Sequence, residues 1–272
     1  MTGHPEIDTS VPHSARIWNH WLGGKDNYPV DREVGDDFVS IFPGQVDIAR
    51  HSRAFLGRAV RYLAGEAGVR QFLDVGTGLP TVDNTHEVAQ RVSPDARIVY
   101  VDNDPLVLVH ARALLTSTPE GATAYVDADI RDPDAILAKA AETLDFDEPV
   151  ALLLLGILGH LTDEEDPEGV LGRLVAALAP GSHVVINDGT DVIGTPGADG
   201  VDESARARAI TRYVQAGGVA YNLRSPERIT GYFSGLELLE PGVVTVSRWR
   251  PEPSPFGEPP AVDAFCGVAR VP

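Results

Sequence analysis

The chain of 272 residues contains little cysteine, few positive charges and no long hydrophobic run. Its one cysteine, Cys266, excludes an internal disulfide bond and any zinc site built on cysteines, and it suits a reducing compartment. The longest apolar run, residues 150–158, is too short to cross a bilayer, and residues 1–10 lack the apolar core that a secretory signal needs. We therefore expect a cytoplasmic protein without a membrane-spanning segment.

The acidic composition limits the kinds of molecule that the protein is expected to bind. A net charge of −18 and a pI near 4.7 work against binding to nucleic acid or to an anionic membrane surface. A small-molecule partner fits this charge better. With 43% hydrophobic residues the chain can bury one sizeable core, so we expect residues 1–272 to form a single domain.

Short apolar runs alternate with amphipathic stretches after residue 70, and this pattern predicts βαβ units in a doubly wound, Rossmann-like α/β sheet. The run at 150–155 is apolar without alternation, as expected of a central strand that is covered on both faces. The expected strands are 71–75, 97–101, 122–126, 150–155 and 183–187, and the expected helices are 84–91, 106–115, 133–144 and 167–178.

The flanking segments divide the chain further. Residues 1–66 are expected to form an N-terminal helical cap, in which a helix at 13–21 leads into the polar loop 23–29, interpreted as a flap over a cofactor. Residues 71–190 form the expected cofactor-binding core, and a Gly- and Pro-rich insertion at 191–222, with a helix at 203–216, is expected to be a substrate lid. Residues 223–272 complete the sheet with strands near 236–249 and 261–268.

A glycine turn follows the first expected strand. Gly76 and Gly78, with Thr77 between them, allow the backbone to turn sharply and to approach a ligand closely. Any nucleotide-binding α/β crossover requires such a turn. Asp74 would face the pyrophosphate of a dinucleotide across a partly dry cleft, whereas S-adenosylmethionine brings an ammonium and a sulfonium. Position 81 is Thr, so the spacing G-x-G-x-x-G is absent. The turn therefore favours a methyl donor over NAD.

Two further acids end the next two expected strands. Asp102, followed by Asn103, can accept hydrogen bonds from ribose hydroxyls. Asp129 can accept from the amine of adenine while Ile130 packs against the ring. Because the carboxyl ends of parallel strands meet at one edge of a sheet, Asp74, Asp102 and Asp129 are expected to line that edge.

Candidate catalytic groups follow the fourth and fifth expected strands. His160 could take a proton from a nucleophilic hydroxyl or amine, and Asp188, with Asn187, could orient a substrate amine or act as the base. Hydrogen bonding within the loops is an alternative role for each. The motifs H-E-x-x-H, G-x-S-x-G and G-K-[ST] are absent, so metalloprotease, serine-hydrolase and P-loop chemistry are excluded and no metal is expected.

These segments together resemble class I S-adenosylmethionine-dependent methyltransferases, and within them a bacterial family whose methyl acceptors are mostly unknown. The resemblance covers nearly the whole chain and is carried by GGKDNY at 23–28, RAFLGRAV at 53–60, QFLDVGTGLPT at 71–81, YVDNDP at 100–105 and DIRDP at 129–133.

The resemblance implies a seven-stranded, mostly parallel sheet whose last strand is antiparallel, with Asp102 on ribose and Asp129 near adenine. It also implies that the flap residues Asn27 and Tyr28 close on the methionine end. The chain departs from the broader pattern at Pro80, where a third glycine is usual, and at Gly159-His160, where relatives often carry two adjacent histidines.

The resulting hypothesis is an S-adenosylmethionine-dependent methyltransferase that acts on an oxygen or nitrogen of a small molecule. The alternatives are a non-catalytic module that binds S-adenosylmethionine or S-adenosylhomocysteine and, on the shared α/β pattern, an NAD-dependent oxidoreductase. The acceptor site is expected to be walled by Tyr28, Tyr213 and Tyr221. The expected cofactor site comprises Asn27, Tyr28, Asp74, Gly76, Thr77, Gly78, Pro80, Asp102, Asn103, Asp129, Ile130, Leu155 and Gly156.

Overall fold

The apolar runs form the strands of one sheet. The computed structural model describes residues 8–114, 116–193 and 204–272, and eight strands in these ranges belong to this sheet. They are β1 (Gln71–Val75), β2 (Arg97–Asp102), β3 (Ala122–Asp127), β4 (Val150–Leu155), β5 (His183–Gly189), β6 (Glu237–Leu238), β7 (Val244–Thr245) and β8 (Ala264–Arg270).

The strand order is β3-β2-β1-β4-β5-β8-β6, and β7 pairs with β8 beside this path. Strands β1 to β5 are parallel, and β8 is antiparallel to β5. The predicted doubly wound, mostly parallel sheet with an antiparallel last strand is therefore confirmed. The predicted count of seven matches the seven strands of the main path, to which β7 adds an eighth.

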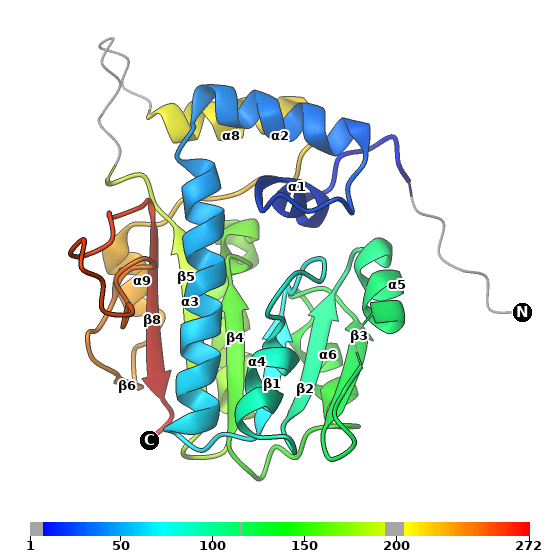
Figure 1. Ribbon diagram of the computed structural model, residues 1–272, viewed down its shortest axis with the longest axis vertical. Coiled ribbons are helices and arrows are strands. Elements are labelled where there is room, and N and C mark those ends of the chain that lie inside the picture. The colour runs from blue at the N-terminus through cyan, green and yellow to red at the C-terminus, as the bar shows by residue number, and fades with distance from the viewer. Residues whose placement is uncertain (1–7, 115, 194–203) are drawn as a thin grey trace, which may run out of the picture.

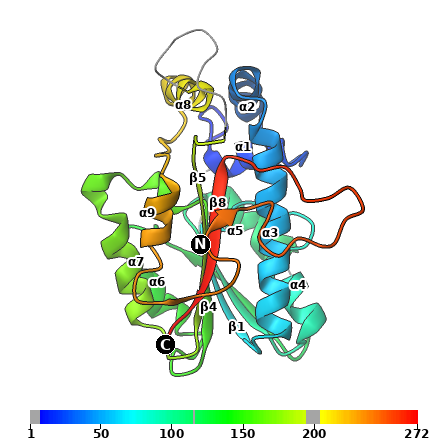
Figure 2. The ribbon, with the colours of Figure 1, turned by 90° about the vertical axis from the view of Figure 1, so that its left-hand side faces the viewer.

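Helices cover both faces of the sheet, as Figure 2 shows. Because side chains alternate along a strand, Phe72 packs against α3 (Gln45–Gly65) and α4 (Thr85–Val92) on one face. Its neighbour Leu73 packs on the other face with α6 (Pro133–Ala140), α7 (Pro167–Ala176) and α9 (Pro226–Gly231). Burial on both faces explains why the central strands are continuously apolar.

Three helices form a cap over the carboxyl ends of the parallel strands (Figure 1). They are α1 (Ser14–Trp21), α2 (Pro29–Ile41) and α8 (Ala205–Gln215), while α5 (Pro105–Leu114) lies beside β3. The cap has its own apolar cluster, in which Ile17 of α1, Phe38 of α2 and Tyr213 of α8 are buried together. The cap therefore joins the N-terminal segment to the segment after β5.

Helix α2 was not predicted from the sequence. It begins with Pro29 at its first turn, and the Tyr28 N–H donates to the Asp31 carboxylate 2.8 Å away. The same carboxylate accepts the N–H of His13 at 3.0 Å, so Asp31 also fixes the chain just before α1. Proline followed by an acid in the first turn is a helix-start signal that would have identified α2.

The predicted strand at 236–249 is wrong. Only β6 and β7 form there, because Pro241 has no N–H for a ladder and Gly242, with a φ of +85°, turns the chain back. The predicted helix at 133–144 ends at Ala140. Residues 194–203 of the predicted lid lie outside the described residues, and the rest of it forms α8 and the segment that leads to α9.

No helix within the described ranges is long and apolar enough to cross a membrane. Cys266 is buried in β8, as expected of a small apolar residue in a strand.

Candidate functional site

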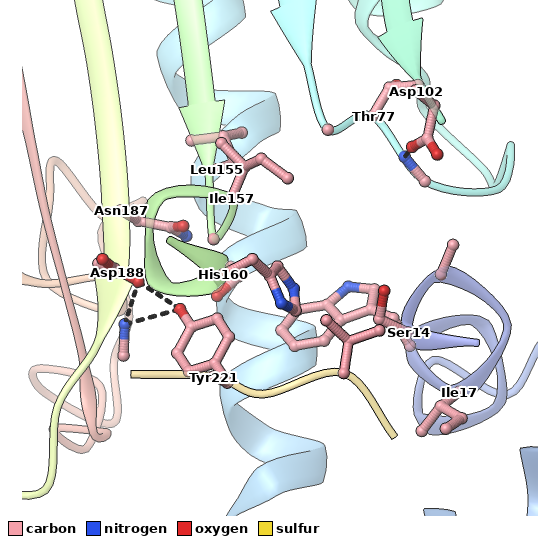
Figure 3. Close-up of a pocket in the computed structure, with 18 of the residues that line it drawn as sticks. Ser14, Ile17, Thr77, Asp102, Leu155, Ile157, His160, Asn187, Asp188 and Tyr221 are labelled. Carbon is pink, nitrogen blue, oxygen red and sulfur yellow. Dashed lines mark hydrogen bonds between the residues drawn. The ribbon is translucent and has the colours of Figure 1, made fainter. Parts of the chain in front are cut away.

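A cavity of about 270 Å³ lies between the carboxyl edge of the sheet and the cap. The glycine turn and the ends of β2, β4 and β5 line its floor, and α1, α2, α3 and α8 contribute to its walls. Figure 3 shows part of it, with Thr77 and Asp102 on one side and Asn187, Asp188 and Tyr221 on the other. Parallel α/β sheets bind ligands at this edge.

The glycine turn is held by the neighbouring strand. The N–H groups of Gly76 and Thr77 both donate to the Val101 carbonyl, at 2.9 and 3.2 Å. Gly76 has a φ of +75°, and a Cβ there would lie 2.7 Å from Ile157. A side chain at this position is therefore excluded both by the backbone conformation and by the wall of the cavity.

Asp74 ends β1 as a buried carboxylate. Its Oδ2 accepts a hydrogen bond from the Thr85 hydroxyl at 2.6 Å. Burial raises the pKa of Asp74 to about 6, although the Thr85 hydrogen bond and the Arg53 charge oppose that rise. A cation bound beside Asp74 would favour its ionised form.

Asp102 links the glycine turn to the loop after β2. Its Oδ2 accepts the Gly78 N–H at 2.8 Å and its Oδ1 accepts the Asp104 N–H at 2.9 Å. Burial raises the pKa of Asp102. Each oxygen retains a lone pair, so the carboxylate can still accept two hydroxyl groups.

Asp104 has a structural role. It caps α5 by accepting the Leu106 N–H at 2.9 Å. Its fully buried carboxylate also lies 3.3 Å from the Arg16 guanidinium and 3.0 Å from the His13 ring. The Arg16–Asp104 ion pair and the His13 contact attach α1 to the loop after β2 and thus hold one wall of the cavity in place.

Asp129 belongs to a polar network at the end of β3. It accepts hydrogen bonds from the Asn103 amide at 2.9 Å and from the Arg131 N–H at 2.9 Å. Burial alone would raise the pKa of Asp129, but these hydrogen bonds and the Arg131 charge lower it. Arg131 also pairs with Glu165, so its charge is shared between two acids.

His160 lies in the short helix η1 (Leu158–His160) after β4, and its ring lines the cavity. Its Nδ1 is 3.1 Å from the Ala220 carbonyl, which can only accept a hydrogen bond. Nδ1 therefore carries the proton and Nε2 carries the lone pair. Burial lowers the pKa of His160, so the ring is neutral at physiological pH.

Tyr221 and Asp188 form a hydrogen-bonded pair beside His160. The Tyr221 hydroxyl donates to Asp188 Oδ1, and the Gly189 N–H donates to both groups (Figure 3). Burial raises the pKa of Asp188 to about 6. The Tyr221 ring meets the His160 ring edge to face, with 5.1 Å between the ring centres. Tyr221 is thus a wall of the cavity that is fixed by Asp188.

The structure brings together most of the predicted site residues. Those that line the cavity are Asp74, Gly76, Thr77, Gly78, Asp102, Asn103, Asp129, Ile130, Leu155, Gly156, His160, Asp188, Tyr213 and Tyr221.

Asn27, Tyr28 and Pro80 are not among the residues that line the cavity. The Asn27 amide donates to Asn19 Oδ1 at 2.9 Å and closes the loop that leads to α2. Tyr28 packs against Leu79 and α5. The N-terminal wall of the cavity is formed by α1 and not by these three residues. Their contact with a cofactor therefore stays a prediction.

Sequence reasoning missed several lining residues on the cap and on α3, notably Trp18, Gln45 and Arg206. Gln45 and Arg206 are 3% and 5% exposed, and their Oε1 and Nε atoms have no hydrogen-bond partner in the described part of the chain. A buried polar residue at the start of a helix carries no motif, so only the packing of the cap reveals these positions.

A model of a family described as S-adenosyl methyltransferase matches residues 1–272. The crystal structure of a DUF574 family protein from Streptomyces avermitilis is 42% identical, covers 98% of this chain and 100% of its own, and superimposes with a TM-score of 0.91. A proposed methyltransferase from Thermobifida fusca is 41% identical, with a TM-score of 0.85 over 98% of this chain and 97% of its own.

A more distant structure shares the fold. The plantazolicin methyltransferase BpumL, solved with S-adenosylhomocysteine, is 14% identical and has a TM-score of 0.51 over 95% of each chain. No curated protein matches this chain in sequence.

Proposed function

The chain belongs to the S-adenosyl methyltransferase family, and on this premise we propose that it methylates an oxygen or nitrogen atom of a small-molecule acceptor bound under the cap. The observation that carries the proposal is one cavity that contains both the glycine turn with its three strand-end acids and the neutral His160 ring. The use of S-adenosylmethionine follows from the family; the acceptor and the residue roles below are proposals.

The floor of the cavity fits the cofactor. Asp102 retains two acceptor positions for the ribose hydroxyls, and Asp129, with Ile130 buried beside it, suits the adenine amine and ring. Asp74 supplies a negative charge near the glycine turn, where the cofactor carries positive charges. When bound, the cofactor supplies a methyl group activated by its sulfonium.

His160 is the better placed of the two candidate bases. Its Nε2 has a free lone pair, whereas Asp188 Oδ1 already accepts from Tyr221 and Gly189 and Oδ2 is buried. We assign proton removal from the acceptor to His160, and we assign the orientation of Tyr221 to Asp188. The remaining rate enhancement would come from alignment of the acceptor and exclusion of water.

A small acceptor is supported by the enclosed shape of the site. The cavity of about 270 Å³ lies beneath three helices, and the net charge of −18 opposes a nucleic-acid substrate. Cytoplasmic location and independence from metal ions stay predictions.

The first test is calorimetric titration with S-adenosylmethionine, S-adenosylhomocysteine and NAD. We expect binding of the first two only. Asp102→Asn should weaken both by about 10–100-fold, since a hydrogen bond to a charged group contributes about 1.5–3 kcal/mol. Asp127→Asn is the matched control, because Asp127 pairs in register with Asp102 but is exposed and outside the cavity lining. Preference for NAD would refute the cofactor assignment.

Turnover separates an enzyme from a sensor. Transfer of a labelled methyl group to any member of an acceptor panel would exclude the alternative of a module that only binds the cofactor. Binding without transfer to an extract of small metabolites would favour that alternative.

A further inference from the structure

The cap side of the cavity is lined by aromatic rings in contact with one another. Trp18 and Trp21 of α1 lie 5.8 Å apart between ring centres, Trp21 and Phe38 lie 5.2 Å apart, and Phe38 and Tyr213 lie 6.1 Å apart. All four line the cavity. A planar apolar molecule would bury its faces against such a cluster, and aromatic pairs contribute about 0.5–1.5 kcal/mol beyond the buried area.

The charges of the cavity oppose an anionic acceptor. Among the described residues, four carboxylates line it: Asp74, Asp102, Asp129 and Asp188. The arginines that line it within the described ranges already have partners.

Each of these three arginines makes hydrogen bonds within the protein, although the Arg206 Nε has no partner in the described residues. Arg53 donates to the Val82 carbonyl and to Asn84, Arg131 pairs with two acids, and Arg206 donates to the carbonyls of Thr190 and Asp263. A carboxylate or phosphate on the acceptor would therefore be desolvated beside four acids, with only the Arg206 Nε, among the buried arginine nitrogens of the described lining, left to meet it. Burial of a charge without a full partner costs several kcal/mol in order of magnitude.

Gln45 indicates a polar substituent on the acceptor. Its Oε1 is buried without a partner in the described residues, and a carbonyl oxygen can only accept. A hydroxyl or N–H on the acceptor can satisfy it, whereas a carboxylate cannot.

The Nε2 of His160 is free to accept a proton from the acceptor. The attacking atom of the acceptor must therefore carry a proton and, at the same time, a lone pair with which to attack the methyl group. An aliphatic ammonium has no lone pair to attack with. A phenol is neutral, has a pKa near 10, and is a far better proton donor than an aliphatic hydroxyl, so a weak neutral base suffices.

We propose that the acceptor is an uncharged aromatic compound with a phenolic hydroxyl, seated against the Trp18, Trp21, Phe38 and Tyr213 rings with that hydroxyl toward His160 Nε2. This deepens, and rests on, the proposed methyl transfer. The phenolic oxygen forms a bond to the methyl carbon while the carbon–sulfur bond breaks and its electron pair stays on sulfur. The phenolic proton passes to His160 Nε2, and the products are an aryl methyl ether and S-adenosylhomocysteine.

The test measures binding before turnover. The full-length protein is first saturated with S-adenosylhomocysteine, which must itself bind, and is then titrated calorimetrically with 2-naphthol, 2-naphthoate and an aliphatic bicyclic alcohol of similar size. We expect 2-naphthol to bind at one site at least about tenfold more tightly than either analogue. Trp18→Ala should weaken 2-naphthol by roughly tenfold or more. Phe256→Ala is the control, because Phe256 is 96% exposed and outside the cavity lining.

Each outcome decides one of the two proposals. No binding of S-adenosylhomocysteine would refute the cofactor assignment of the proposed function. Binding of S-adenosylhomocysteine followed by no preference for 2-naphthol, or by tighter binding of 2-naphthoate, would overturn the aromatic-hydroxyl proposal alone. An unchanged affinity in Trp18→Ala would overturn the seating on the aromatic cluster. Labelled 2-methoxynaphthalene formed from 2-naphthol would support both.

Discussion

Replacing Asp188 with asparagine should change how the stability of the protein depends on pH. Asp188 is 1% exposed, and burial raises its pKa from 3.8 to about 6. Between these values the folded protein binds more protons than the unfolded chain. The contribution of Asp188 to stability is therefore largest at low pH and declines as the pH rises through about 6.

The magnitude follows from the two pKa values. Keeping the carboxylate ionised in the folded protein costs about 3 kcal/mol relative to the protonated form. Between pH 8 and pH 5 the wild-type protein should gain about 1.4 kcal/mol from this one group. The asparagine side chain of the Asp188→Asn variant takes up no proton between pH 8 and pH 5. Asp74, whose pKa is also raised to about 6, titrates equally in both proteins, so its contribution cancels when the two are compared.

The assay is urea unfolding of the cofactor-free protein, followed by tryptophan fluorescence at about pH 5 and pH 8. We compare the free energy of unfolding of Asp188→Asn with that of the wild type. Relative to the wild type, the variant should be about 1.4 kcal/mol more stable at pH 8 than it is at pH 5. Asp134→Asn, at an exposed carboxylate whose pKa is lowered by Arg173, should show no difference of that sign. A pH-independent difference for Asp188→Asn would refute the argument that Asp188 is a desolvated carboxylate.

Three further predictions concern the base, the turn and the cap. His160→Gln should reduce methyl transfer by about 10²–10⁴-fold at unchanged S-adenosylhomocysteine affinity. Because burial lowers the pKa of His160, the wild-type rate should fall to half its maximum only at a pH below 6.5. Equal transfer rates in the variant and the wild type would exclude His160 as the base. Gly76→Ala should lower the free energy of unfolding, measured thermally, by about 1–3 kcal/mol and should abolish cofactor binding. Gly57→Ala, at a position with open space around it, should do neither. Asp104→Ala should lower the free energy of unfolding in urea by about 3–5 kcal/mol, because it removes the buried partner of Arg16. Asp36→Ala, in an exposed pair with a histidine, should lower it by less than about 1 kcal/mol. Similar losses in the two variants would contradict the anchoring of α1 by Asp104.

The floor of the site could be predicted because it depends on local sequence. A strand-end acid followed by Gly76 and Gly78 requires a sharp turn, and β1, β2 and β3 place Asp74, Asp102 and Asp129 at one edge through the parallel pairing alone. The alternation of apolar runs therefore determined both the sheet and this part of the site.

The walls could be predicted only in part, through Tyr213 and Tyr221. Trp18, Gln45 and Arg206 come from three helices, and what places them together is the packing of α1, α3 and α8 over the sheet. The polar loop at 23–29 is rich in specific side chains, and this composition favours a flap over the cofactor. In the structure Asn27 uses its amide to hold that loop closed on itself, so the same composition serves local folding.

The segment after α8 connects the cap to the candidate base. The Ala220 carbonyl accepts a hydrogen bond from His160 Nδ1, the Tyr221 hydroxyl donates to Asp188, and the Asn222 N–H donates to the Gly159 carbonyl at 2.7 Å. A Cβ at position 159 would lie 2.4 Å from the Tyr221 ring. Gly159 is therefore coupled to Tyr221, since the ring occupies the space that a side chain at 159 would need. The orientation of His160 therefore depends on the segment at 220–222 that follows α8.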